Sequence, residues 1–265
     1  MDIPINVETV KETMKHQRRL VIIMLNIVIF SILPVGFHVA VLNVPSEIIQ
    51  NAIRTSLLSD FDYYIEQSSL NVLWSIIVAS QSIGALLGCY FILPLLGSLG
   101  TKSALLLFNN CILVFGSLIM AFSYTNMTPL LLIGGRILTG IYTGLACSLV
   151  PIYVAEIAPP ELRGAISCAV HIAVCIGSAA GAIFSLDFIL GGPQTWGLLM
   201  LFPAIIGAVQ ILLSIYVIPE SPNYYIRNLH CGKVSKSVDH KKRLEAWLPY
   251  RTLLQCSHLC PLWIH

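Results

Sequence analysis

Charged side chains are scarce in this sequence. Of its 265 residues only 11% are charged, whereas 56% are hydrophobic, and the mean hydropathy is +0.81. Soluble domains carry about 25% charged residues. The formal net charge of +2 is small, and no basic stripe with interleaved aromatic residues occurs, so nucleic acid is excluded as a partner. The composition indicates an integral membrane protein whose partner is the lipid bilayer.

Catalytic and metal-binding motifs are also missing. The sequence has no G-x-S-x-G, H-E-x-x-H or G-x-x-x-x-G-K, which excludes the common esterase, zinc protease and P-loop chemistries. Five of the eight cysteines lie inside apolar runs and three in a polar C-terminal region, without the spacing of a disulfide framework or a zinc site. We therefore expect no enzymatic activity, no catalytic residue, no metal and no cofactor.

Long apolar runs are what the sequence does have. Six runs reach the roughly 20 residues that a helix needs to cross a hydrocarbon core of about 30 Å. They are continuous rather than alternating, which favours helices over barrel strands. The predicted spans are residues 20–42, 70–93, 103–124, 129–154, 165–186 and 197–218. We expect a cytoplasmic N-terminus over residues 1–19, a six-helix transmembrane half-bundle over 20–218 and a cytoplasmic tail over 219–265.

Two features of the ends of these runs predict the topology. The first run is longer than the apolar core of about 7–15 residues in a cleavable signal, so we expect it to remain as a signal anchor. Thirteen of the fifteen Lys and Arg residues fall on one side if the N-terminus is cytoplasmic; Arg54 falls outside and Arg136 lies within the fourth span. The positive-inside rule then places both termini in the cytoplasm, with outer loops at residues 43–69, 123–128 and 187–196.

Glycine pairs predict how the spans pack. Small residues let helix backbones approach each other in lipid, and three spans carry a G-x-x-x-G pair. The pairs are Gly84 with Gly88, Gly140 with Gly144, and Gly177 with Gly181. Glycine is common in membrane helices in general, which is the alternative explanation. Pairs on three different spans favour a compact bundle around a central space.

Charged corners end the fourth and sixth spans. Glu156 and Arg163 flank a Pro-Pro pair, and Glu220 lies in P-E-S-P at residues 219–222. Proline stops a helix, and a charge at membrane depth costs about 2.5–3.5 kcal/mol unless it is paired or hydrated. Two three-helix units that each end in such a corner indicate the internal repetition of secondary transporters.

These motifs resemble a known family. G-R at residues 135–136 with the following glycines, P-x-Y-x-x-E-I-A-P-x-x-L-R-G at 151–164, and P-E-S-P at 219–222 are similar to the N-terminal half of a sugar porter of the major facilitator superfamily. The resemblance is closest to animal facilitative glucose transporters and covers roughly residues 20–228. It implies an all-α membrane protein, built as two three-helix repeats, that transports hexose sugars by alternating access.

The resemblance also implies a substrate site. His171 stands where the family carries a sugar-contacting glutamine, Val174 and Ser178 follow on the same helix face, and Asn43 is expected along the path. An imidazole donates and accepts hydrogen bonds as an amide does, but it can also gain a proton between pH 5 and 8. An acid-sensitive step or proton coupling is therefore expected. The alternative is a structural histidine that is hydrogen-bonded to a neighbouring helix.

A cytoplasmic gate is implied by the charged corners. The resemblance assigns to it Glu156, Arg163, Glu220 and Lys102. The family has paired arginines in the loop before the third span, whereas residues 97–102 here are G-S-L-G-T-K. Because lysine is a point charge and arginine a bidentate fork, we expect a weaker inside gate.

Further positions are implied as structural parts of the path: Arg136, Trp74, Pro151 and Gly164. A direct contact of Arg136 with the sugar is the alternative, because intramembrane cations are often functional. His38 and Val39 replace residues that are more often an amide and a small hydroxyl residue in the family, so we expect a narrowed or changed substrate range.

The resemblance ends after one of the two halves of such a transporter. From Leu248 onward the sequence fits neither a linker helix nor a seventh span, which predicts a truncated or alternative end. The other prediction is a non-transporting half that pairs with and modulates a full-length sugar transporter; pairing with a second copy of the chain is a third. The family default for localisation is the plasma membrane.

Overall fold

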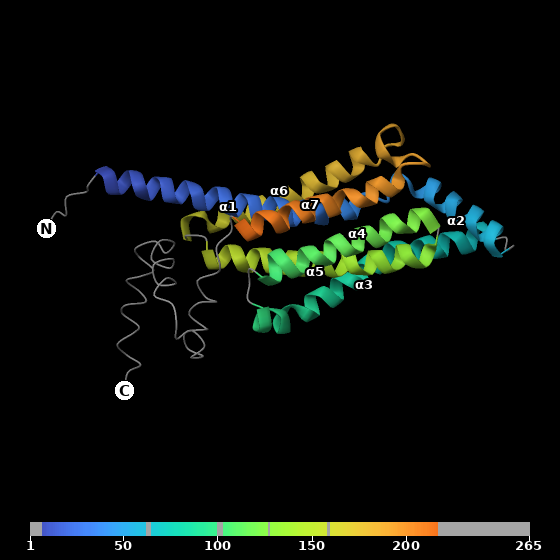
Figure 1. Ribbon diagram of the computed structural model, residues 1–265, viewed down its shortest axis with the longest axis horizontal. Coiled ribbons are helices and arrows are strands. Elements are labelled where there is room, and N and C mark those ends of the chain that lie inside the picture. The colour runs from blue at the N-terminus through green and yellow to red at the C-terminus, as the bar shows by residue number, and fades with distance from the viewer. Residues whose placement is uncertain (1–6, 62–64, 100–102, 127, 158–159, 217–265) are drawn as a thin grey trace. The chain divides into compact units, whose positions relative to one another are not determined.

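The computed structural model describes residues 7–61, 65–99, 103–126, 128–157 and 160–216, and every regular element in these ranges is helical (Figure 1). The elements are α1 (Val7–Ala40), α2 (Ser46–Phe61), α3 (Gln67–Leu99), η1 (Ser103–Phe108), α4 (Asn109–Asn126), α5 (Pro129–Ile157), α6 (Pro160–Phe184), η2 (Asp187–Gly191) and α7 (Trp196–Tyr216). Both η segments are π-helical. The chain divides at Pro219 into two units, and the tail unit lies outside the described residues.

The predicted spans are confirmed as helices. Five of them are long and apolar enough to cross a membrane, with bounds of 67–96, 103–125, 129–154, 164–184 and 196–215. The first predicted span lies in α1, whose described apolar part, Met24–Ala40, is shorter than a full crossing. Because α1 already begins at Val7, the predicted boundary at residue 19 falls inside a helix. The predicted boundary of the tail stays a prediction.

The spanning helices form two layers. We call α3, α5, α1 and α6 the front layer and α4 with α7 the back layer; these names do not refer to the viewing direction of Figure 1. In the front layer α3 packs along α5, α5 contacts α1, and α1 packs along α6. In the back layer α4 packs against α7, and it also covers α5. The first repeat consists of α1, α3 and α4, and the second of α5, α6 and α7. The second helix of each repeat packs on the first helix of the other, and the two third helices, α4 and α7, pack together. This exchange joins the two repeats into the half-bundle fold that the sequence predicted.

Glycine contacts hold the two pairs of the front layer together. A Cβ atom added at Gly84 would collide with the carbonyl oxygen of Ile137, and one at Gly140 with that of Gln81. On the other pair, Gly177 faces the backbone of Leu33 in the same way. The predicted close approach at the G-x-x-x-G pairs is thus confirmed. Gly36, for which the sequence predicted no packing role, makes an equally close approach to Val174.

A helix occupies the outer loop that was predicted over residues 43–69. Along α2, Ile49 and Ile53 are buried and join a hydrophobic cluster with Phe37, Trp196 and Leu199. The spacing of the two isoleucines, one turn apart, was the available signal for an amphipathic helix. We call the end of the half-bundle that carries α2 the outer end; in Figure 1 α2 lies beside the start of α3.

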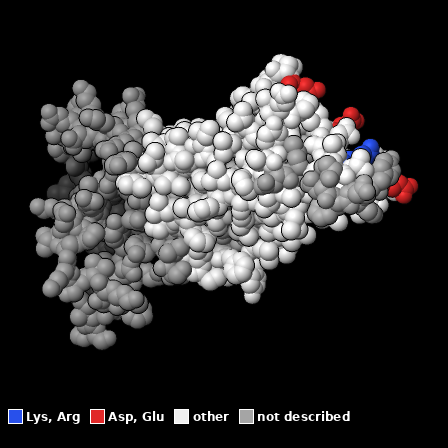
Figure 2. All heavy atoms as spheres, turned by 45° about the vertical axis from the view of Figure 1, so that its right-hand side comes forward, with Lys and Arg blue, Asp and Glu red and all other residues white. Residues whose placement is uncertain are grey.

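Charge is confined to the outer end in the described part of the surface. Figure 2 shows acidic and basic atoms at that end and an uncharged band over the other described residues of this face. The exposed described acidic residues include Glu47, Glu66 and Asp187. An uncharged band of this kind suits the hydrocarbon core of a bilayer, so the chain is a multi-pass membrane protein.

Candidate functional site

The two layers expose different chemistry. Of the apolar stretch of α3 and of α6, only 22% of the residues are buried, compared with 56% in α5. On the back layer the exposed side chains in mid-span are large and apolar, among them Phe115, Leu118, Phe122, Ile205 and Leu212. The edges of the front layer also expose large apolar side chains, among them Ile83, Leu86 and Ile172. They differ from the back layer in carrying exposed polar groups as well: Ser82 and His171 within the apolar stretches of α3 and α6, and Asn71 and Ser75 in the first turns of α3. The front layer therefore offers hydrogen-bonding groups at its exposed edges, whereas the mid-span surface of the back layer suits lipid.

His171 is exposed on α6 and has no hydrogen-bond partner among the described residues. The alternative of a histidine bonded to a neighbouring helix finds no support there. Val174 lies one turn away, half-buried, and its carbonyl oxygen faces Gly36. The Ser178 hydroxyl donates to the carbonyl oxygen of Gly36 at 3.1 Å, so it joins α6 to α1 in this structure.

Asn43 is not brought together with these α6 residues. It follows the end of α1 in a turn, where its backbone N–H donates to the carbonyl of Ala40 at 3.1 Å. Since Phe37 lies beside Gly181, Asn43 falls near or beyond the outer end of α6, several turns from His171. Its place is at the outer end, and the substrate role of all four residues stays a prediction.

Two of the four predicted gate residues, Glu156 and Arg163, have a described backbone, which lies at the end of the half-bundle opposite α2. Glu156 is in the last turn of α5 and Arg163 in the first turn of α6. The backbone thus places both residues at the same end, as the proposed pairing requires. Their side chains lie outside the described residues, as do Lys102 and Glu220 entirely.

Arg136 is a buried junction between three helices. Its side chain is 2% exposed, and its Nη1 donates to the carbonyl oxygen of His38 at 3.0 Å and to Oε1 of Gln81. These bonds join α5 to α1 and α3. The geometry favours the structural interpretation of Arg136 over a direct contact with sugar.

His38 is fully buried, and neither ring nitrogen has a partner among the described residues. Its neighbour Val39 is 59% exposed. Of the two positions predicted to alter the substrate range, only Val39 therefore reaches a surface. Any effect of His38 on substrate would have to act through the packing around Arg136.

A second buried polar junction was missed in the sequence. The Tyr142 hydroxyl donates to the carbonyl oxygen of Ser31 at 2.7 Å, and Nε2 of Gln210 lies 2.5 Å from the Ser31 hydroxyl oxygen. The two contacts join α1 to α5 and α7. Three polar residues inside apolar runs were the available signal, but the sequence does not say that they meet.

The other structural positions have simpler surroundings. Trp74 is half-buried against the hydrophobic cluster at the outer end. Pro151 lies inside α5 and is exposed. Gly164 is exposed near the start of α6, and a Cβ atom added there would meet nothing within 4 Å.

Comparison with known proteins agrees with this architecture. The family model described as "Sugar (and other) transporter" matches residues 23–248. Facilitated glucose transporter member 5 of solute carrier family 2 from Equus caballus is 33% identical over 212 residues, which is 80% of this chain and 42% of that protein. Member 4 of the same family from Mus musculus is 34% identical over 218 residues, with the same coverage. The chain spans less than half the length of these relatives.

Solved structures share the fold. The proton:xylose symporter XylE bound to 6-bromo-6-deoxy-D-glucose aligns with a TM-score of 0.67 at 20% identity, over 79% of this chain and 46% of that one. A double tryptophan mutant of XylE aligns with a TM-score of 0.74 at 19% identity, over 90% and 52%. The named relatives are transporters rather than enzymes. The chain belongs to the sugar transporter family.

Proposed function

We propose that this chain serves the transport of hexose-like sugars across a membrane by alternating access, with the front layer as one wall of the path. Family membership supports this function. The observation that carries it is the segregation of exposed polar groups: Asn71, Ser75 and Ser82 on α3 and His171 on α6, against apolar exposed side chains in mid-span on the back layer.

The chemistry of a sugar explains why a wall of this kind is needed. Each hydroxyl group that leaves water must find another hydrogen-bond partner, because an unmet buried polar group costs about 1–3 kcal/mol. Amide, hydroxyl and imidazole groups supply both donors and acceptors without adding charge. At the end opposite α2, pairing of Glu156 and Arg163 with Glu220 and Lys102 would close the path, as the family resemblance implies.

Uptake by the purified full chain in proteoliposomes tests the proposal. We expect saturable uptake of D-glucose or another D-hexose that exceeds uptake of L-glucose. His171→Leu should lower uptake at subsaturating sugar, while Cys111→Ser, at an exposed position on α4, should leave it unchanged. Uptake that is neither saturable nor stereoselective would contradict the proposal.

The cellular arrangement belongs to the same proposal. In this proposal both termini lie in the cytoplasm and the protein resides in the plasma membrane. Thr55→Cys, at an exposed position of α2, should react with a membrane-impermeant thiol reagent added to intact cells. Reaction only after permeabilisation would mean that α2 faces the cytoplasm or that the protein resides in an internal membrane, and either result would contradict the proposed arrangement.

A further inference from the structure

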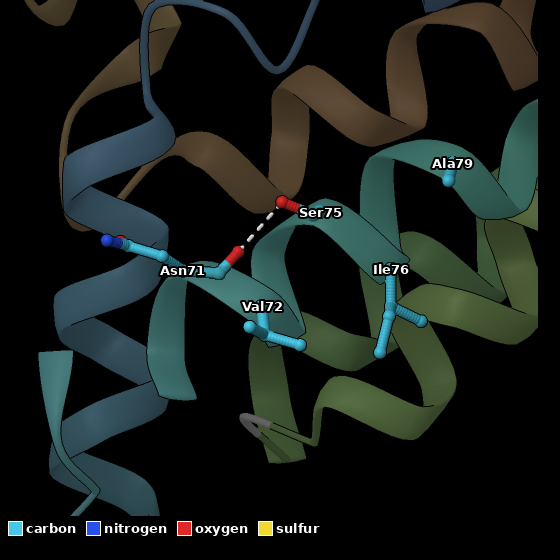
Figure 3. Close-up of a pocket in the computed structure, with 5 residues that line it drawn as sticks. All are labelled: Asn71, Val72, Ser75, Ile76 and Ala79. Atoms are coloured by element: carbon cyan, nitrogen blue, oxygen red, sulfur yellow. Dashed lines mark hydrogen bonds between the residues drawn. The ribbon is translucent and has the colours of Figure 1, made fainter. Parts of the chain in front are cut away.

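A hollow of about 400 Å³ lies on the exposed side of α3 near the outer end (Figure 3). We call it the α3 hollow. It is lined by Asn71, Val72, Ser75, Ile76 and Ala79. All five residues belong to one helix and the hollow is open, so it can contact a ligand on one side only. No lining residue is charged, so the chemistry favours a neutral ligand.

Asn71 is held by a chain of hydrogen bonds that begins on another helix. Arg54 of α2 donates through Nη2 to Oε1 of Gln67, and Nε2 of Gln67 donates to Oδ1 of Asn71 at 3.1 Å. The amide oxygen of Asn71 is therefore occupied, which sets the orientation of its carboxamide. The two hydrogens on Nδ2 have no partner among the described residues, so a donor remains available at the edge of the hollow.

Ser75 supplies the complementary acceptor. Its hydroxyl donates to the carbonyl oxygen of Asn71 at 2.9 Å, the bond drawn in Figure 3. The lone pairs of the hydroxyl oxygen remain free to accept. In the same view Val72 and Ile76 project from a different side of α3 than Asn71 does. The α3 hollow is thus bordered by a donor and an acceptor on one side and by two apolar side chains on another.

We propose that the α3 hollow is an outer subsite for a sugar, where a pyranose ring lies with its C–H face on Val72 and Ile76 and its hydroxyl groups at Asn71 and Ser75. This inference rests on the proposed transport function and adds a site at the outer end where the sugar binds first. The subsite is separate from the position of His171, because α3 and α6 stand at opposite edges of the front layer. Ser82, exposed two turns inward on α3, supplies the next hydroxyl along the helix.

Sugar protection of an introduced cysteine tests the subsite in the full chain. Ser75→Cys should react with a membrane-impermeant maleimide applied from the side of α2. D-glucose at about four times its dissociation constant should slow the reaction roughly fivefold, since the rate follows the unoccupied fraction; L-glucose should not. Leu118→Cys, exposed on the back layer, should stay unlabelled, and the native chain gives the background of its own cysteines.

A second variant tests the hydrogen-bond chain. Gln67→Leu in the Ser75→Cys background should raise the glucose concentration for half-protection about two- to tenfold, the worth of one hydrogen bond. Asn51→Ala, at an exposed asparagine of α2 outside the hollow, should not change it. An unreactive Ser75→Cys, or a reactive one that D-glucose does not protect, would overturn the subsite.

Uptake by the unmodified chain separates the two proposals. Stereoselective uptake together with an unprotected Ser75→Cys would refute the subsite and leave transport standing. Protection of Ser75→Cys without any uptake would support sugar binding at the α3 hollow and refute transport by the chain.

Discussion

Nη1 of Arg136 donates a hydrogen bond to the carbonyl oxygen of His38 at 3.0 Å, across 98 residues of sequence. The same nitrogen donates to the side chain of Gln81. A single guanidinium therefore joins the three helices α1, α3 and α5 of the front layer. Its side chain is buried, so these hydrogen bonds are not made to bulk water.

Replacing Arg136 should destabilise the half-bundle. Arg136→Leu leaves the His38 carbonyl and the Gln81 amide oxygen without their donor, at about 1–3 kcal/mol for each unmet group. Arg136→Lys keeps the charge and can reach one acceptor, so it should lose less. Thermal unfolding in detergent measures both, with a loss of about 2–4 °C expected per kcal/mol. Equal melting of Arg136→Leu and the native chain would show that these bonds do not matter.

Gly36 offers a test of the α1–α6 pairing. In Gly36→Ala the new methyl group would strike the backbone of Val174, so the two helices must separate and lose their packing contacts. Gly134→Ala is the matched control in α5, because a Cβ atom there meets nothing within 4 Å. We expect a lower melting temperature for Gly36→Ala. The control should melt at the native temperature or slightly above, since alanine favours helix by roughly 0.5–1 kcal/mol; the same result for both variants would contradict the pairing.

The junction at Ser31 predicts coupled effects. Tyr142→Phe removes the donor to the Ser31 carbonyl and should cost about 0.5–1.5 kcal/mol. Gln210→Met removes the contact with the Ser31 hydroxyl. Because both side chains act on the same residue, the double variant should deviate from additivity by about 0.5 kcal/mol or more. Tyr90→Phe, at an exposed tyrosine, is the control and should melt like the native chain; strict additivity would mean that the two contacts are independent.

His171 carries the prediction about acid sensitivity. The family resemblance implies an acid-sensitive uptake step at this imidazole, because it stands where the family carries a glutamine, and uptake is therefore compared between pH 8 and pH 5. His171→Gln keeps a donor and an acceptor but cannot gain a proton, so its uptake should depend less on pH. Initial rates across this range test the point. A flat profile for the native chain would exclude both the acid-sensitive step and proton coupling at this residue.

The positions of the spans were predictable because membrane thickness sets the length of an apolar run, and this constraint acts within each segment. The glycine pairs were predictable for a similar reason, since backbone approach requires small residues at a fixed spacing. By contrast, the partners of Arg136 lie 55 and 98 residues away. Contacts of this kind depend on the register between helices, which no single segment encodes.

The candidate site shows the same division. The motif position of His171 predicted a polar residue, and the structure places it on an exposed face. That Ser178 would bond to Gly36 instead of facing the path depends on the rotation of α6 against α1, which the sequence alone does not give. Helix α2 was missed because its apolar face is short and lies between two much longer runs.

The exchange of helices between the two repeats has a consequence for biosynthesis. Because α3 packs on α5 and α6 packs on α1, each repeat depends on the other for the main packing partners of its helices. During translation α3 enters the bilayer before α5 has been synthesised, so its glycines remain exposed to lipid until α5 is inserted. Two fragments separated near Met127 should therefore be unstable when expressed singly and should recover each other when expressed in the same cell.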